Sequence, residues 1–258
     1  MVSDLFLEGF LAATIAGLVT GVGGFMVFLK KRYTRENINL MLNIAAGIML
    51  AASFFSLLAP SMEKILTFHQ DPAVAGFWYI CAIFSGVLLV WILNAVLPHE
   101  HNYIGHHGMG FNLKASWLFI IAITIHKFPE GLGVGVAYSG EDMLNPLSLT
   151  IGIALQNIPE GLTVAISLVA VGYSKCKAGF VAMLTGLVQP VGAIVGLLIM
   201  EISDKVVPLG MALAGGTLLF VIVNEILPET YDTKKSQKAA AAVFIGFIAM
   251  TYISIVLE

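Results

Sequence analysis

The stretch AVAGFWYICAIFSGVLLVWILNAVL, residues 73–97, contains no Asp, Glu, Lys, Arg or His along its whole length. A helix that crosses a lipid bilayer needs about 20 mostly apolar residues, because each residue rises about 1.5 Å through a hydrocarbon core about 30 Å thick. This stretch meets that length. It is therefore predicted to span a membrane as an α-helix.

The composition extends this prediction to the whole chain. Of the 258 residues, 58% are hydrophobic and 11% are charged, and the mean hydropathy is +0.91. Soluble domains carry about 25% charged residues, so the composition excludes that class. The ten-residue alternating segments of a membrane β-barrel do not occur. Eight stretches are predicted to be spanning helices: 5–29, 38–59, 73–97, 115–137, 147–171, 178–200, 206–227 and 239–257.

We therefore predict an all-α, polytopic integral membrane protein that forms a single transmembrane domain over residues 1–258. The connections between helices are short, and only the His-rich loop 98–114 is longer. Together with the absence of a recognisable targeting signal, these short loops favour the inner membrane of a bacterium.

The positions of the basic residues predict the orientation in the membrane. Most of the 13 Lys and Arg residues flank the loops that follow the first, third, fifth and seventh predicted helices. By the positive-inside rule these loops are cytoplasmic, so both termini are predicted to be extracytoplasmic. The basic residues concerned are Lys30, Lys31, Arg32, Arg35, Lys114, Lys175, Lys177, Lys234, Lys235 and Lys238.

Two pairs of helices resemble each other in sequence. HKFPEGL at 126–132 is repeated as QNIPEGL at 156–162, and the Ala-Gly…Pro pattern of 46–60 is repeated at 214–228. The helices of each pair run in opposite directions across the membrane. Inverted repeats of this kind are typical of transporters, whose binding sites lie near the bilayer midplane on helices that Pro or Gly interrupts.

Small residues recur every four positions on several of the predicted helices. Such spacing lets helix backbones approach closely in lipid, so these positions are predicted to be helix–helix packing faces. They are Gly9, Ala13, Gly17 and Gly21, then Gly131 and Gly135, and finally Gly192 and Gly196.

A polar constellation lies in the middle of the helices 115–137 and 147–171. His126 and Glu130 are four residues apart, as are Gln156 and Glu160, so each pair shares one helix face. The two helices are predicted to be antiparallel neighbours because the turn between them is short. One imidazole, two carboxylates and one amide oxygen are therefore expected to converge.

The cost of this arrangement in lipid favours a functional role. An ionised residue at the centre of a spanning helix costs about 3 kcal/mol. Pro129 and Pro159 each leave a helix carbonyl without its usual donor. Such groups persist where they are buried in protein or line a watery cavity. A purely structural ion-pair network of Lys127, Glu130 and Glu160 remains the alternative.

The donor types indicate which ligand would bind. Mixed nitrogen and carboxylate donors suit Zn²⁺, Fe²⁺, Mn²⁺ and Co²⁺. An all-oxygen site for Mg²⁺ or Ca²⁺ fits His126 less well. Two other classes stay open: an intramembrane metal-dependent hydrolase, although no H-E-x-x-H helix occurs, and an ion-coupled transporter of a small solute.

With these motifs, and with AAGIMLAASF at 45–54, the chain resembles bacterial members of the ZIP family of zinc- and iron-transporter-like proteins. The resemblance implies uptake of divalent metal ions toward the cytoplasm, and we therefore expect no enzymatic activity. The Pro-Glu-Gly kinks let the two site helices move, so we expect alternating access. Zinc is the first expectation, and Fe²⁺, Mn²⁺, Co²⁺ and Cd²⁺ are further candidates. A homodimer in the lipid bilayer, without a nucleic-acid partner, is also implied. The implied metal ligands are His126, Glu130, Gln156, Glu160 and, more weakly, Met49.

The chain departs from the family pattern at a second metal position. Where relatives often place an amide and acids around a second ion, this chain has Lys127, Asn157 and Gln189. An ammonium group repels a further dication. We therefore hypothesise that Lys127 takes the place of the second ion and that each chain binds one metal.

Four histidines occur in the predicted cytoplasmic loop 98–114. Clustered histidines can receive a metal that leaves a transport site, but the same pattern also fits a solvated turn without a role. Both interpretations stay open for His99, His101, His106 and His107.

Overall fold

The computed structural model describes residues 2–30, 33–69, 71–96, 99–101, 105–107, 115–139, 146–200, 206–230 and 236–257. In these residues eight helices are long and apolar enough to cross a membrane, and two short strands accompany them. The predicted all-α, multi-pass membrane fold is confirmed.

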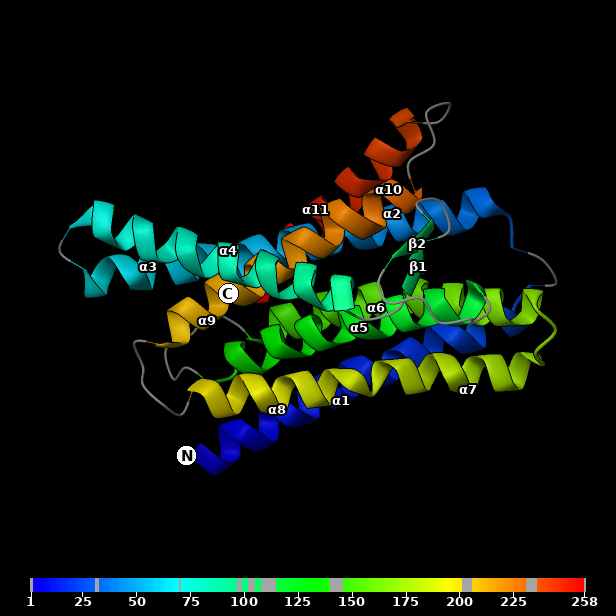
Figure 1. Cartoon of the computed structure of the whole chain (residues 1–258), viewed down its shortest axis with the longest axis horizontal. Helices are drawn as coiled ribbons and strands as arrows, with labels where there is room; N and C mark the ends of the chain where they lie inside the picture. The colour runs from blue at the N-terminus through cyan, green and yellow to red at the C-terminus, as the bar shows by residue number, and fades with distance from the viewer. Residues whose placement is uncertain are drawn as a thin grey trace.

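Several of the eight spans consist of more than one helical segment (Figure 1). The first half of the chain contains α1 (Val2–Phe25) with the 3₁₀ turn η1 (Met26–Phe28), α2 (Arg35–Ser53) with the π-helical segment η2 (Phe54–Leu58) and α3 (Ala59–Phe68), α4 (Pro72–Val96), and the strands β1 (His99–His101) and β2 (Gly105–His107). The second half contains α5 (Ala115–Ala137), α6 (Pro146–Ala170), α7 (Lys175–Gly186) with α8 (Val188–Met200), α9 (Val206–Val221) with the π-helical segment η3 (Ile222–Ile226) and α10 (Leu227–Thr230), and α11 (Ser236–Leu257).

The second span is longer than the predicted helix 38–59. It begins at Arg35, because the Thr34 side chain caps the helix by accepting a hydrogen bond from the Asn37 N–H at 3.2 Å. The helix continues past Pro60, where the sequence predicts its end, and it ends at Phe68. Pro60 falls in the first turn of α3, directly after the wider π-helical turn η2, which lets the span continue past the proline.

The same arrangement recurs in the seventh span. There η3 lies before Pro228 as η2 lies before Pro60, with the same spacing to the preceding Ala-Gly pair. The two π-helical segments therefore occupy corresponding positions of the predicted inverted repeat. π-Helical turns are rare and are frequent at functional sites.

The sixth span is interrupted at Leu187, between α7 and α8. Pro190 explains the interruption, since its ring would clash with the carbonyl of Gly186 in a regular helix. The interruption lies next to Gln189, which is completely buried.

The helices form two groups that contact each other. In one group α1 packs against α6 and α7, and α5 packs against α8. In the other α2 packs against α11, and α4 packs against α9, while α2 also contacts α6. Figure 1 shows that both ends of the chain lie in the left half of the view, whereas the β1–β2 hairpin and the connections after α1 and α6 lie toward the right.

Close glycine contacts hold the first group together. A Cβ on Gly131 would lie 1.9 Å from the carbonyl oxygen of Gln189, and one on Gly17 would lie 2.3 Å from that of Gly186. A Cβ on Gly192 would come within 2.2 Å of the Phe128 carbonyl oxygen. The predicted small-residue packing faces are therefore confirmed at these positions.

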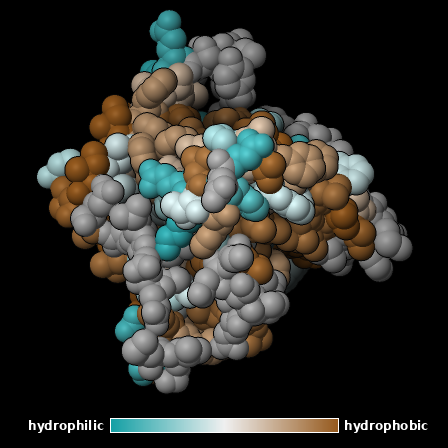
Figure 2. All heavy atoms as spheres, turned by 90° about the vertical axis from the view of Figure 1, so that its left-hand side faces the viewer, coloured by the Kyte–Doolittle hydropathy of each residue, from teal (hydrophilic) through white to brown (hydrophobic). Residues whose placement is uncertain are grey.

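Apolar side chains cover the outside of the bundle. Seen from the left-hand end of Figure 1, apolar residues occupy the flanks of the molecule and many hydrophilic ones lie nearer the centre (Figure 2). This distribution suits a protein whose sides face lipid. Large apolar side chains exposed on α4 and α11 include Phe77, Ile80, Phe84, Trp91, Phe244, Ile248 and Ile255.

Two glycines of α4 provide a matched test of this packing. A Cβ on Gly86 would lie 2.0 Å from the carbonyl oxygen of Leu213 on α9, whereas one on Gly76 would meet no described atom within 4 Å. Gly86→Ala should therefore lower the free energy of unfolding in detergent micelles by about 1–3 kcal/mol through overpacking. Gly76→Ala should leave it unchanged or raise it by less than about 1 kcal/mol. Equal effects of the two substitutions on thermal unfolding would contradict the α4–α9 contact.

Candidate metal site

The predicted site residues of α5 and α6 lie in the interior of the bundle. His126, Glu130, Gln156 and Glu160 are all buried, and the Gln156 side chain is completely enclosed. Pro129 and Pro159 lie inside helices that continue past them. Each proline leaves the carbonyl four residues earlier without its helical donor, so both helices are locally polar where the site residues lie.

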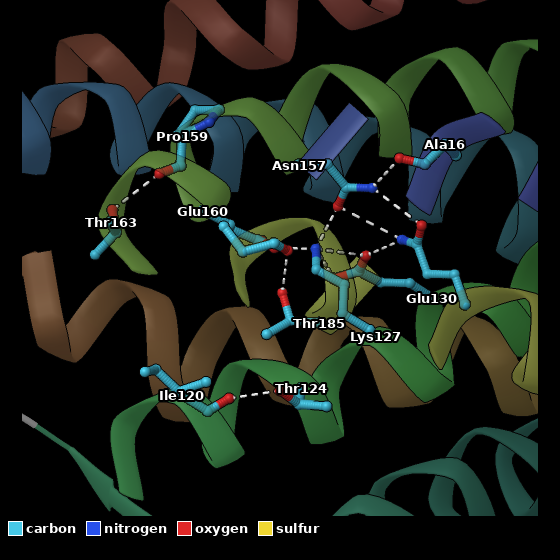
Figure 3. A network of polar contacts seen from close by, with 12 residues as sticks. Ala16, Ile120, Thr124, Lys127, Glu130, Asn157, Pro159, Glu160, Thr163 and Thr185 are labelled. Atoms are coloured by element: carbon cyan, nitrogen blue, oxygen red, sulfur yellow. Dashed lines mark hydrogen bonds and ion pairs between the residues drawn. The ribbon is translucent and has the colours of Figure 1, made fainter. Parts of the chain in front are cut away.

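The Lys127 ammonium group joins the two glutamates. Lys127 is completely buried, and its Nζ lies 3.1 Å from Glu130 Oε2 and 3.4 Å from Glu130 Oε1. The same Nζ also donates hydrogen bonds to Glu160 Oε2 and to Asn157 Oδ1 (Figure 3). The structure therefore brings the carboxylates of α5 and α6 together, with an ammonium group between them.

Two buried amides orient this network. Asn157 Nδ2 donates to the Ala16 carbonyl oxygen of α1 at 2.7 Å and to Gln189 Oε1 at 3.1 Å. Gln189 Nε2 donates to Glu130 Oε2 at 2.5 Å. The N–H groups of Asn157 therefore point away from the lysine, and its oxygen points toward it. Four helices, α1, α5, α6 and α8, contribute to one connected set of hydrogen bonds.

Gln156 differs from its neighbour Asn157. Neither its Nε2 nor its Oε1 has a hydrogen-bond partner within the part of the chain that the structure describes. A buried polar group without a partner costs about 1–3 kcal/mol. Native proteins seldom leave such groups unsatisfied, and the exceptions call for an explanation such as a ligand.

The structure does not present a complete cage for a metal ion. Among the described residues, no three His, Cys, Asp or Glu side chains are grouped closely enough to bind one. The two glutamates lie together, but one oxygen of Glu160 and both oxygens of Glu130 face the Lys127 ammonium group. Metal binding through both glutamates would therefore require the carboxylates to share their oxygens between the metal and Lys127.

Met49 lies in different surroundings. It is buried in an apolar cluster with Ala46 and Ile222, against which Leu50 and Leu227 pack. This environment matches what the sequence alone suggests for Met49, which was included among the ligands because of the family resemblance.

The four loop histidines belong to the β1–β2 hairpin. The strands are antiparallel, and their register pairs His99 with His107 and Glu100 with His106, while His101 pairs with Gly105. Strand β1 contacts α5. Pro98, 102–104 and 108–114 of the predicted loop lie outside the described residues.

Sequence reasoning missed the part that α1 plays. Its Ala16 carbonyl accepts from Asn157, and the buried Thr20 hydroxyl lies near the end of α7, where a Cβ on Gly186 would be 2.8 Å from it. The close Gly17–Gly186 approach brings α1 to this position. Thr20 is a polar residue on a helix whose small residues, such as Gly17, already predict close packing, and these two signals together could have identified α1.

Comparison with known proteins identifies the class of this site. The family model of the ZIP zinc transporters matches residues 98–254. The chain is 35% identical over 241 residues to the zinc transporter GufA of Myxococcus xanthus, covering 93% of this chain and 95% of the relative. It is 36% identical over 235 residues to the zinc transporter ZIPB of Bordetella bronchiseptica, covering 91% and 76%. Identity to the zinc transporter ZupT of Streptococcus mutans is 30% over 260 residues, covering 96% and 97%.

These relatives are transporters and not enzymes, so the hydrolase alternative loses its support. The matches cover nearly the whole length of the chain and include the polar segments of α5 and α6. The chain therefore belongs to the ZIP family of zinc transporters, which are multi-pass membrane proteins that move divalent metal ions.

Proposed function

We propose that this protein carries Zn²⁺ toward the cytoplasm by exposing a site on α5 and α6 alternately to the two sides of the membrane. The observation that carries the proposal is the Gln156 amide, which is completely buried without a hydrogen-bond partner in the described residues. It lies one helical turn from Glu160, whose carboxylate meets that of Glu130 at Lys127. Such a group is suited to a ligand that binds and is then released.

The proposed ligands are His126, Glu130, Gln156 and Glu160. One imidazole nitrogen and three side-chain oxygens give four donors, which is the coordination number that Zn²⁺ usually adopts in proteins. Met49 remains a weaker fifth ligand, since its side chain packs among apolar residues. The same donors also suit Fe²⁺, Mn²⁺, Co²⁺ and Cd²⁺, which we retain as further substrates.

Basic residues at one end of the bundle support the predicted orientation in the membrane. Lys30, Lys175, Lys177 and Lys238 lie beside the connections after α1, α6 and α10, and the Lys175 ammonium donates to the Lys30 carbonyl oxygen at 3.4 Å. Basic loops remain on the cytoplasmic side, which would place both termini outside. Five further predicted positions lie outside the described residues: Lys31, Arg32, Lys114, Lys234 and Lys235.

The interrupted helices support alternating access. Pro129 and Pro159 weaken α5 and α6 next to the site, and η2 and η3 interrupt the second and seventh spans at corresponding positions. Transporters with inverted repeats bind their substrates at such interruptions. We place the protein in the bacterial inner membrane, and assembly as a homodimer stays a prediction, as does a role of the loop histidines in metal exit.

Substitution of either glutamate should abolish transport. In proteoliposomes, Glu130→Gln and Glu160→Gln should each lower saturable ⁶⁵Zn²⁺ uptake at least about tenfold, because each removes an anionic ligand of nearly unchanged size. The control is Glu36→Gln, which changes an exposed acid paired with Lys238 at 3.2 Å and should transport normally. Wild-type uptake in both glutamate variants would refute transport through this site.

Substitution of two neighbouring amides on α6, Gln156 and Asn157, should distinguish a metal ligand from a residue that stabilises the fold. Gln156→Leu should leave the thermal stability of the metal-free protein unchanged or higher, because it removes an unpartnered amide, yet it should reduce Zn²⁺ affinity. Asn157→Leu should lower the free energy of unfolding by about 2 kcal/mol or more, since Asn157 hydrogen-bonds to Lys127, Ala16 and Gln189. Unchanged Zn²⁺ affinity of Gln156→Leu in calorimetry would exclude Gln156 as a ligand.

A further inference from the structure

The groups around Lys127 match an ammonium group both in the number of hydrogen-bond acceptors and in charge. An ammonium has three N–H donors, and three acceptor groups face it: the carboxylates of Glu130 and Glu160 and the amide oxygen of Asn157. The side chain is completely buried, and the acceptors come from two different helices. A long cationic side chain that merely avoided lipid would instead extend toward the membrane surface.

Neighbouring groups keep these acceptors turned toward Lys127. Asn157 can direct its oxygen to the ammonium because both of its donor contacts, to Ala16 and Gln189, lie on the other side of its amide. Gln189 in turn holds Glu130 Oε2 at 2.5 Å. The position of Gln189 is fixed by the close backbone approach between α8 and Gly131. The network is thus preorganised around a cation.

The site consequently has two unlike halves. One half, made of Lys127, Asn157 and Gln189 with the glutamates, has its polar groups engaged with one another. The other half contains Gln156, whose amide lacks a partner among the described residues. Glu160 connects the two halves, because it shares a face of α6 with Gln156 and its carboxylate meets that of Glu130 at Lys127.

We propose that Lys127 is a tethered cation that permanently occupies one half of the transport site, so that each chain binds and carries a single divalent metal ion. This inference rests on the proposed function, because it assigns Lys127 a role in the same site. Lys127 is then a specificity-determining residue that sets the number of ions, whereas the metal itself binds in the half that contains Gln156.

Charge and donor supply both favour one ion. The two carboxylates and the ammonium group together carry one negative charge, which a single dication more than neutralises. A second dication would lie next to the ammonium group, and like charges repel strongly where water is excluded. The oxygens that a second ion would need already accept from Lys127 and Gln189. The tethered cation also keeps the two carboxylates from facing each other uncompensated when no metal is bound.

The test is the Zn²⁺ stoichiometry of the full chain in detergent, measured by equilibrium dialysis with ⁶⁵Zn²⁺. Three proteins are compared: the wild type, the variant Asn157→Asp/Gln189→Glu with Lys127 retained, and the same variant with Lys127→Asn. The added acids supply anionic donors in the lysine half, so the last two proteins differ only in the cation. Size-exclusion chromatography verifies folding of each protein.

We expect one Zn²⁺ per chain in the wild type and in the variant that retains Lys127, and two in the variant that lacks it. Two ions in the wild type, or in the variant that retains Lys127, would overturn the inference while leaving zinc transport intact. One ion in the folded variant without Lys127 would also overturn it. A wild type that binds no Zn²⁺ would contradict the proposed function and the inference together. If the variant without Lys127 does not fold, the Zn²⁺ stoichiometries of the other two proteins still test the inference, since two ions in either would overturn it.

Discussion

The contact between the Lys127 ammonium group and two carboxylates in the interior of a membrane protein is the constraint on which the site depends. Each charge alone would be costly at this depth, and removing one partner of a buried ion pair typically costs about 3–5 kcal/mol. Glu130 and Lys127 come from α5, whereas Glu160 and Asn157 come from α6, so the contact joins the two helices that carry the repeated Pro-Glu-Gly segments. We propose that this ion pair, which on its own could be a purely structural network, is one part of the metal site.

The glycines make this contact possible by setting how close the helices lie. At Gly131 the α8 backbone comes so near that Gln189 can reach Glu130, and at Gly17 the α1 backbone approaches the end of α7 at Gly186. The Ala16 carbonyl then accepts from Asn157. Because lipid provides no hydrophobic force between helices, such close packing and interhelical hydrogen bonds supply much of the attraction. The packing of the bundle and the polarity of the site therefore have a common origin.

Much of this could be predicted from the sequence, because spanning helices follow from length and apolarity and because charges in a membrane helix are conspicuous. The burial of Glu130 and Glu160 and the close approach at Gly131 were predicted in this way. Other features depend on three-dimensional neighbours. The continuation of the second span past Pro60 depends on a π-helical turn that no local residue pattern announces. The direction of the Asn157 amide, and the lack of a partner for that of Gln156, depend on α1 and α8, which are distant in sequence.

X-ray absorption at the zinc edge of the loaded wild-type protein tests the central claim most directly, since it reports the ligands and any second metal together. The account predicts nitrogen and oxygen ligands at about 2.0–2.2 Å, with the multiple-scattering signature of one imidazole. It also predicts no metal–metal signal at the separation of about 3.5–4 Å that two-metal sites show. A spectrum that lacks the imidazole, or that contains a zinc–zinc signal, would contradict a single zinc ion bound beside Lys127.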